Sequence, residues 1–275
     1  MTVSKVSASR VAAFRTAVYG HFRLYGRDLP WRRTADPYRI LVSEVMLQQT
    51  QAGRVAAKYD GFVAAFPDLQ TLAEAPLRAV LEAWQGLGYN RRAQRLQLAA
   101  RMALTEWGGR IPAEPGELAR LPGIGRATAA AVAVFAFDIP VVFIETNIRA
   151  ALLHVFFPTG ENVPDSAILP YAERVLDRGR PRYWYNALMD YGAMLKRERG
   201  NACVRSAHYS RQTPFSGSGR QVRGRVIAAL TRRARLSLPE LTEAAETEPE
   251  RVRAAVEDMI AEGLLRRTGG RIAIA

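Results

Sequence analysis

The sequence of 275 residues has a single cysteine, Cys203, so no disulfide can form within the chain. One thiolate also cannot assemble a cysteine-based zinc or iron–sulfur site, because such sites need several cysteine ligands. No run of 18 apolar residues is present, and the N-terminus lacks the apolar core of a secretory signal peptide. We therefore expect no metal ion, no membrane attachment and a reducing, cytoplasmic setting.

Alternation of apolar and polar residues, the pattern of a β-strand, is absent before residue 265. The body instead shows short amphipathic segments at helical spacing, separated by turns with Gly and Pro, which predicts an all-α fold. The expected helices include residues 38–50, 71–83 and 150–156, and residues 200–220 are expected to be irregular. The aromatic residues of the segment 183–194 are expected in the core.

The C-terminal segment shows a different pattern. One helix is expected at residues 220–233, a second starting at Ser237 and a third from Glu248 to Ile260, followed by two short strands around a Gly269-Gly270 turn. Three helices and a two-stranded wing are typical of a winged helix, here residues 220–275. Residues 236–275 hold five Arg and eight acids, so DNA reading and protein packing both stay open as roles.

Acidic residues are few relative to basic ones. The chain has 39 Lys and Arg against 26 Asp and Glu, a net charge of +13. This excess favours a protein that binds a polyanion such as nucleic acid, and the alternative is a ribosomal or merely soluble basic protein. Residues 196–235, the basic strip, hold eleven Lys and Arg and one acid, Glu198. Because a solvated face would mix the signs, the basic strip is interpreted as phosphate-contacting.

Glu44 is a lone carboxylate in the apolar, helical stretch from Val42 to Gln51. Val45 and Met46 fall on one helix face with Val42, and Glu44 lies beside that face. Partial burial raises the pKa of a carboxyl group towards the range in which it can donate a proton. The alternative is a structural acid near a helix N-terminus, with Ser43 as the cap.

Residues 115–137 combine a short helix, the turn 121–125 with sequence LPGIG, and a long apolar helix that begins at Arg126. Two glycines just before a helix N-terminus leave backbone N–H groups accessible to phosphate. The complete frame is the helix-hairpin-helix pattern, for which an ordinary corner between two helices is the alternative.

A second lone acid, Glu145, follows the apolar run 141–144 and precedes Asn147. A simple N-cap is one interpretation. Because Thr146 and Asn147 can cap the next helix without it, Glu145 is instead interpreted as the partner of Glu44 in a pair of catalytic carboxylates.

In their order and spacing these segments resemble the helix-hairpin-helix DNA glycosylases of the endonuclease III-like superfamily, closest to the MutY adenine glycosylase branch. The resemblance covers about residues 10–200, and it rests on the segments PWR (30–32), PY (37–38), SEVMLQQTQ (43–51), GLGY (86–89), LPGIGR (121–126) and ETNIR (145–149). It implies two helical domains with a DNA-binding cleft between them. One is a six-helix barrel at 30–137 and the other combines 1–29 with 138–212, before a linker at 213–219.

The resemblance also implies a chemistry, in which adenine mispaired with guanine or 8-oxoguanine is flipped into the cleft and excised. Glu44 would protonate the leaving adenine, Glu145 would stabilise the oxocarbenium-like sugar, and Asn147 would hold Glu145 or the DNA backbone. Trp31, Arg32 and Asp190 would border the base pocket. Double-stranded DNA would be contacted by Gln48, Gln49, Thr50, Leu87, Tyr89, Leu121, Gly123, Gly125, Arg126, Ala127, Thr128, Arg149, Arg205 and Arg211.

Four features of the sequence depart from that family pattern. Glu145 stands where Asp is usual, and a displacement of about 1 Å can lower a rate by about 100-fold. Only Cys203 stands where relatives carry a four-cysteine iron–sulfur loop, so no cluster is expected. Ala127 replaces the lysine of bifunctional relatives, so no Schiff base can form there and a monofunctional enzyme is expected. A winged helix replaces the usual MutT-like domain that reads 8-oxoguanine.

We therefore expect a monomeric, nucleoid-associated enzyme of bacterial or archaeal type that acts on DNA containing a mispair or lesion. A glycosylase for uracil, thymine or an alkylated purine is the second hypothesis. The third is a non-catalytic protein that binds lesions or mismatches, whereas a winged-helix transcription regulator is disfavoured by the short, acidic C-terminal segment.

Overall fold

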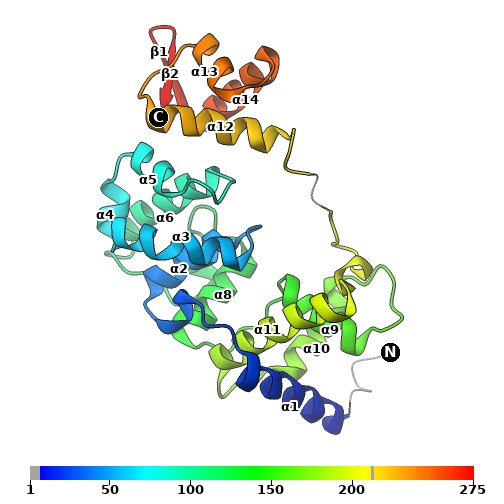
Figure 1. Ribbon diagram of the computed structural model, residues 1–275. Coiled ribbons are helices and arrows are strands. Elements are labelled where there is room, and N and C mark those ends of the chain that lie inside the picture. The colour runs from blue at the N-terminus through cyan, green and yellow to red at the C-terminus, as the bar shows by residue number, and fades with distance from the viewer. Residues whose placement is uncertain (1–6, 212–213) are drawn as a thin grey trace. The chain divides into compact units, whose positions relative to one another are not determined.

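The computed structural model describes residues 7–211 and 214–275, and the predicted all-α fold is confirmed (Figure 1). Residues 1–6 of the predicted N-terminal segment, and residues 212 and 213 beside and within the predicted linker, lie outside the described residues. The elements are α1 (Ala8–Tyr25), η2 (Pro30–Arg33), α2 (Pro37–Leu47), α3 (Ala52–Ala65), α4 (Leu69–Glu74), α5 (Leu77–Ala83), α6 (Arg91–Glu106), α7 (Pro115–Leu118), α8 (Arg126–Phe137), α9 (Thr146–Phe156), α10 (Asp165–Val175), α11 (Pro181–Arg199), η3 (Ala202–Arg205), α12 (Gly219–Arg232), α13 (Leu238–Ala245), α14 (Pro249–Ala261), β1 (Leu265–Thr268) and β2 (Arg271–Ile274).

The described residues form two compact units that do not follow chain order. The first unit comprises residues 7–37, 113–116 and 125–211, and the second comprises residues 38–112, 117–124 and 214–275. Residues 30–37, expected in the barrel, thus group with the first unit, and the C-terminal module (219–275) groups with the second. The predicted domain boundaries and the winged-helix assignment stay predictions.

Aromatic packing forms the core of the first unit. Trp184 and Tyr185 of α11 are buried, as expected for the segment 183–194, while Tyr183 stays 39% exposed. The ring of Phe14 on α1 meets Phe156 at 5.3 Å and Trp184 at 6.1 Å between centroids, both edge to face. Such contacts stabilise by more than the buried area alone. They fix α1, α9 and α11 together, and α9 carries Glu145 at its start.

Gly192 allows α11 to lie directly on the start of α9. A Cβ atom there would stand 2.0 Å from the carbonyl oxygen of Asn147 and 2.7 Å from its carbonyl carbon. We therefore expect Gly192→Ala to lower the free energy of unfolding by about 1–3 kcal/mol in urea denaturation, because the two helices must separate.

The matched control for that variant is Gly20→Ala in α1, where an added Cβ meets nothing within 4 Å. Alanine has the better helix propensity, so this variant should gain about 0.5–1 kcal/mol. Equal stability of Gly192→Ala and the wild type would contradict the close approach of α9 and α11.

One predicted helix in the second unit is wrong. Residues 71–83 do not form a continuous helix, because α4 ends at Glu74 and α5 begins at Leu77. Pro76 lies between them in an extended conformation, with φ −58° and ψ 134°. A proline lacks the N–H of a helix interior and disfavours helical conformation in the residue before it. Leu72, Leu81 and Trp84 are nevertheless buried, and α4 and α5 both pack against α6.

The C-terminal module contains the predicted three helices and hairpin (Figure 1). Strands β1 and β2 pair antiparallel from Leu265 opposite Ile274 to Thr268 opposite Arg271. A capping box, in which Ser237 and Glu240 bond each other's backbone N–H, starts α13. Among the helices of the described chain, none combines the length and apolar character needed to cross a membrane.

Candidate functional site

Glu44 lies half-buried in the second half of α2, between the buried residues Ser43 and Val45. Helix α2 begins at Pro37, so the alternative of an acid near a helix N-terminus is wrong. Ser43 is not a cap either, since its hydroxyl donates to the carbonyl oxygen of Ile40 at 2.8 Å inside the helix. The backbone therefore fixes Glu44 on a rigid, well-packed helix, which suits a group that must be held in place.

Arg92, in the first turn of α6, ties together the segments that follow α2 and precede α6. Its guanidinium donates to the carbonyl oxygens of Val45 (2.8 Å), Met46 (2.8 Å), Gln48, Leu87 (3.2 Å) and Gly88 (3.1 Å), and to the hydroxyl of Thr50 (3.0 Å). Burial lowers the pKa of Arg92 to about 10. Arg92 was not predicted from the sequence. Its position just after a glycine-rich turn was the only indication of such a role.

The turn before α6 presents Tyr89 at the surface. Gly86, Gly88 and Tyr89 have positive φ angles of 91°, 72° and 48°. A tyrosine with positive φ is unusual and strained by about 1–3 kcal/mol, which is the type of conformation that surrounding structure retains at functional sites. Leu87 is 2% exposed whereas Tyr89 is 38% exposed. Of the two residues in this turn that are predicted to contact DNA, only Tyr89 reaches the surface.

The hairpin turn contacts the end of α2. Gln48 donates through Nε2 to the carbonyl oxygen of Gly123 at 3.2 Å. Gly123 has φ 82°, and an added Cβ there would lie 2.9 Å from Cβ of Arg95, so glycine is required. Together with Arg92, this contact brings three predicted DNA-contacting segments, 48–50, 87–89 and 121–123, into one cluster of the second unit.

The remaining hairpin residues belong to the first unit. Gly125 is the N-cap of α8 with φ −81°, a conformation open to any residue, and a Cβ there would meet nothing within 4 Å. Arg126 and Ala127 are exposed and Thr128 is half-buried. The anion site at this helix start stays a prediction.

Glu145 is itself the N-cap of α9, which begins at Thr146 rather than at residue 150. Its Oε1 accepts from the backbone N–H of Asn147 at 2.7 Å and of Ile148 at 2.9 Å. The inference that Thr146 and Asn147 make Glu145 unnecessary as a cap is therefore wrong. The reason is geometric, because a glutamate one residue before a helix can fold back onto its first N–H groups.

The second oxygen of Glu145 has a different partner. Asn147 donates through Nδ2 to Oε2 at 3.4 Å. Burial raises the pKa of Glu145, while the two backbone N–H groups and the positive charges of Lys196 and Arg149 oppose that shift. One carboxylate oxygen thus caps the helix, and the other accepts a hydrogen bond from an amide. The capping role of Glu145 is therefore compatible with a catalytic role.

Asp190 holds two arginines in the first unit. Arg32 donates from Nη1 to Oδ2 at 2.8 Å and from Nη2 to Oδ1 at 2.7 Å. Arg27 donates from its backbone N–H and from Nε, at 2.8 and 2.7 Å. Trp31 is 6% exposed beside them. The three residues predicted to border the base pocket thus lie on neighbouring elements, with Asp190 and Arg32 already satisfied by each other.

The Asp190 cluster predicts a pH dependence of stability. Burial alone would raise the pKa of Asp190, but the hydrogen bonds and charges of Arg32 and Arg27 hold it below the usual range. The stabilisation is therefore present above about pH 4, the ordinary aspartate value, and is lost as the pH falls through the folded-state pKa. We expect the unfolding free energy of Asp190→Asn to fall less steeply below pH about 4 than that of the wild type.

The exposed residue Asp60 supplies the control for this pH titration. Chemical denaturation at a series of pH values should give Asp60→Asn the wild-type slope. A wild-type slope in Asp190→Asn as well would show that the ion pair does not lower the pKa of Asp190.

Two of the predicted DNA-contacting arginines make contacts inside the protein. Arg149 pairs with Asp165 through two hydrogen bonds of 2.8 and 2.7 Å, and Arg205 donates to the carbonyl oxygens of Leu153 (3.2 Å) and Pro158 (2.8 Å). Arg211 is exposed. In the basic strip, Arg223 pairs with Glu262, Arg225 with the carbonyl of Ala245, and Arg233 with Glu240. The basic strip is thus not an unbroken phosphate-contacting surface.

The residues do not fit an iron–sulfur cluster. A cluster needs four thiolates, and Cys203 alone is available. Cys203 is buried, and its thiol donates to the carbonyl oxygen of Thr146 at 3.3 Å. Val163 pairs with the backbone around Ser206, which fixes the same segment by main-chain hydrogen bonds. Within residues 7–211 and 214–275, no three His, Cys, Asp or Glu gather as a metal site.

The chain is similar in sequence to a family of DNA repair proteins and to named DNA glycosylases. Residues 42–176 match the family described as HhH-GPD superfamily base excision DNA repair protein. The chain is 33% identical over 282 residues to the adenine DNA glycosylase of Mycolicibacterium smegmatis, covering 94% of this chain and 93% of that protein. It is 37% identical over 199 residues to the human adenine DNA glycosylase, but spans only 36% of that protein's length.

A solved structure of a thermostable thymine-DNA glycosylase is also similar. It superposes with a TM-score of 0.62 at 27% identity, over 71% of this chain and 91% of that one. The matched part, 71% of this chain, is much longer than the hairpin region of residues 115–137. The similarity therefore extends well beyond the hairpin.

Proposed function

Because this chain belongs to the HhH-GPD superfamily of base excision DNA repair proteins, we propose that it is a DNA glycosylase that excises adenine. The substrate is duplex DNA in which adenine is mispaired with guanine or 8-oxoguanine. The names of the human and mycobacterial relatives support adenine as the base. The observation that carries the proposal is the position of Glu44, a half-buried acid on helix α2. The end of that helix leads directly into the cluster formed by residues 48–50, 87–89 and 121–123.

In this proposal Glu44 is the general acid. A flipped adenine is a poor leaving group until a ring nitrogen is protonated, and a positioned carboxylic acid supplies that proton. The N-glycosidic bond then breaks with its electron pair going to the base. A water molecule adds to C1′ of the sugar and loses a proton, which leaves an abasic site and free adenine.

Glu145 is the second carboxylate of the mechanism. Its Oε1 is fixed by the N–H groups of Asn147 and Ile148, and its Oε2 lies 3.4 Å from the amide nitrogen of Asn147. In ionised form this carboxylate stabilises the positive charge that develops on the sugar. The anchoring by α9 gives the longer glutamate side chain a defined position in place of the aspartate usual in the family.

The reaction stops at hydrolysis. Ala127 has no amine to form a Schiff base with C1′, so cleavage of the DNA strand by β-elimination is not expected. The enzyme works without an iron–sulfur cluster, since the donor set of residues 200–211 does not fit one.

Thymine is the second candidate base. The structural similarity to a thymine-DNA glycosylase at 27% identity supports it. Both candidates share the same flipping step and differ in the base pocket, which the family resemblance places at Trp31, Arg32 and Asp190.

The test is a strand-cleavage assay with the purified protein. Duplexes carry adenine, thymine, uracil or an alkylated purine opposite guanine or 8-oxoguanine, and alkali afterwards cleaves any abasic sites. Breaks at adenine that appear only after alkali support the proposal. Breaks at thymine support the second candidate, and tight binding without breaks on every duplex contradicts a glycosylase. Breaks without alkali contradict the monofunctional reaction.

A further inference from the structure

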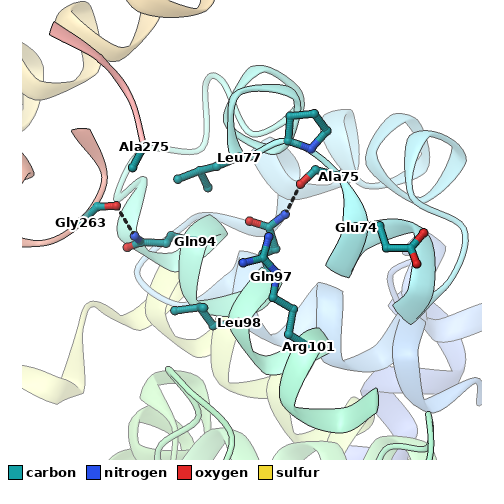
Figure 2. Close-up of a pocket in the computed structure, with 10 residues that line it drawn as sticks. Glu74, Ala75, Leu77, Gln94, Gln97, Leu98, Arg101, Gly263 and Ala275 are labelled. Carbon is teal, nitrogen blue, oxygen red and sulfur yellow. Dashed lines mark hydrogen bonds between the residues drawn. The ribbon is translucent and has the colours of Figure 1, made fainter. Parts of the chain in front are cut away.

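The C-terminal module docks on the edge formed by α5, α6 and the turn between them. Arg78 donates to the carbonyl oxygen of Thr231 at 2.6 Å, and Gln85 bonds the hydroxyl of the same residue. Gln94 donates to the carbonyl oxygen of Gly263 at 2.7 Å, as Figure 2 shows beside a cavity of about 410 Å³. Thr231 is 5% exposed. These contacts fix the position of α12 along the edge of the second unit.

That position sets Arg220, at the start of α12, on Tyr89. Nη1 of Arg220 donates to the Tyr89 hydroxyl at 3.0 Å, and its guanidinium carbon lies 5.7 Å from the ring centroid. The guanidinium of Arg92 lies 5.5 Å from the same centroid. An exposed aromatic ring in contact with two guanidinium groups combines the two features that bind nucleic acid without sequence preference, a stacking surface and positive charge.

We propose that Arg220 is a positioning residue of the DNA-binding surface. It holds the Tyr89 ring outward through the hydroxyl contact, and its guanidinium reaches a phosphate of the strand that Tyr89 engages. This inference rests on the proposed function, and it assigns the C-terminal module a direct part in substrate binding. Residues 236–275 of the module hold five Arg against eight acids, which argues against an independent DNA-reading role for that part. The module's contribution is therefore concentrated at the start of α12, next to Tyr89.

Salt dependence distinguishes a phosphate contact from a docking contact. Affinity for duplex DNA falls with salt in proportion to the number of phosphates neutralised, with a slope of about −0.9 per phosphate on logarithmic axes. Removing one phosphate contact should therefore flatten the slope by about 0.9. A residue that only stabilises the fold leaves the slope unchanged.

The experiment measures Kd of the full chain for a duplex with a tetrahydrofuran abasic-site analogue, between 50 and 200 mM salt. Arg220→Ala should bind several-fold more weakly at 50 mM salt, and the difference should shrink about 3-fold at 200 mM salt. Arg253→Ala, which removes one charge from the exposed face of α14, is the control and should keep the wild-type affinity and slope. Arg220→Lys should keep most of the slope, because an ammonium group also binds phosphate.

A second variant tests whether the effect passes through Tyr89. Tyr89→Phe keeps the ring and removes the hydroxyl that Arg220 contacts, so adding Arg220→Ala to it should have a smaller effect than in the wild type. Fully additive effects would overturn the positioning role. A wild-type slope for Arg220→Ala, with or without a lower Tm, would overturn the phosphate contact. A wild-type protein that binds this duplex but excises no base from any mispaired duplex would overturn only the proposed function.

Discussion

Replacing Glu44 with glutamine is expected to lower single-turnover base excision by about 10²–10⁴-fold, the usual contribution of a general acid. Glutamine has nearly the same shape, so α2 and the neighbouring contacts of Gln48 and Arg92 should persist. The expected result is an intact protein that binds mispaired duplex with wild-type affinity and does not release adenine. Single-turnover release and a binding titration on the same duplex measure the two quantities separately.

Glu82→Gln provides the control for the Glu44 variant. Glu82 lies on the exposed face of α5 in the same unit, so its replacement removes the same charge outside the site. It should excise at the wild-type rate. Full activity of Glu44→Gln would show that another group protonates the base, and loss of binding would show that Glu44 acts on the fold instead.

The second large effect is expected at Arg92. Arg92→Met keeps the apolar length of the side chain but removes every hydrogen-bond donor to residues 45–50 at the end of α2 and to residues 87–88 before α6. Several partly buried carbonyl oxygens then lose their partner, and each such loss costs about 1–3 kcal/mol. We expect the free energy of unfolding to fall by about 3–5 kcal/mol, at the upper end of single-residue effects. Where the variant still folds, residues 48–50 and 87–89 lose their common anchor and DNA affinity falls.

Arg91→Met separates that effect from simple loss of charge. Arg91 is the preceding residue, its side chain is half exposed, and its guanidinium is 3.9 Å from the Glu262 carboxylate. Exposed pairs of this kind contribute about 0–1 kcal/mol. Urea denaturation should therefore show a small change for Arg91→Met beside a large one for Arg92→Met. Similar losses in both variants would contradict the anchoring role of Arg92.

Much of the fold could be predicted because its determinants are local. Helical spacing of apolar residues gave most of the helices, and the glycine pattern gave the hairpin and the Gly269-Gly270 turn. The one divided helix, at Pro76, was missed because the apolar spacing continues across the break. A pattern of side chains reports which face is buried, whereas the missing N–H of a proline affects only the backbone.

For the candidate site, the sequence singles out the two carboxylates but not the contacts that hold the surrounding segments. Glu44 and Glu145 were found as lone acids in apolar surroundings, which is a feature of the sequence. The capping by Glu145 is local, but the sequence also allows Thr146 and Asn147 as caps, so it does not decide between them. The six hydrogen bonds of Arg92 depend on where distant segments meet. Arg92 reaches Val45, 47 residues earlier in the chain, and no local pattern indicates such a contact.

The docking of the C-terminal module also has a consequence for how the protein is made. Arg78 and Thr231 are 153 residues apart in the chain, and Gln94 and Gly263 are 169 apart. A nascent chain emerges at about 5–20 residues per second, so the edge of α5 and α6 stays uncovered for several seconds after its own synthesis. Contacts of such long sequence separation form late in folding. We therefore expect the ribosome-bound intermediate to expose this edge to chaperones, and Tyr89 to acquire its Arg220 partner only after the last helices are released.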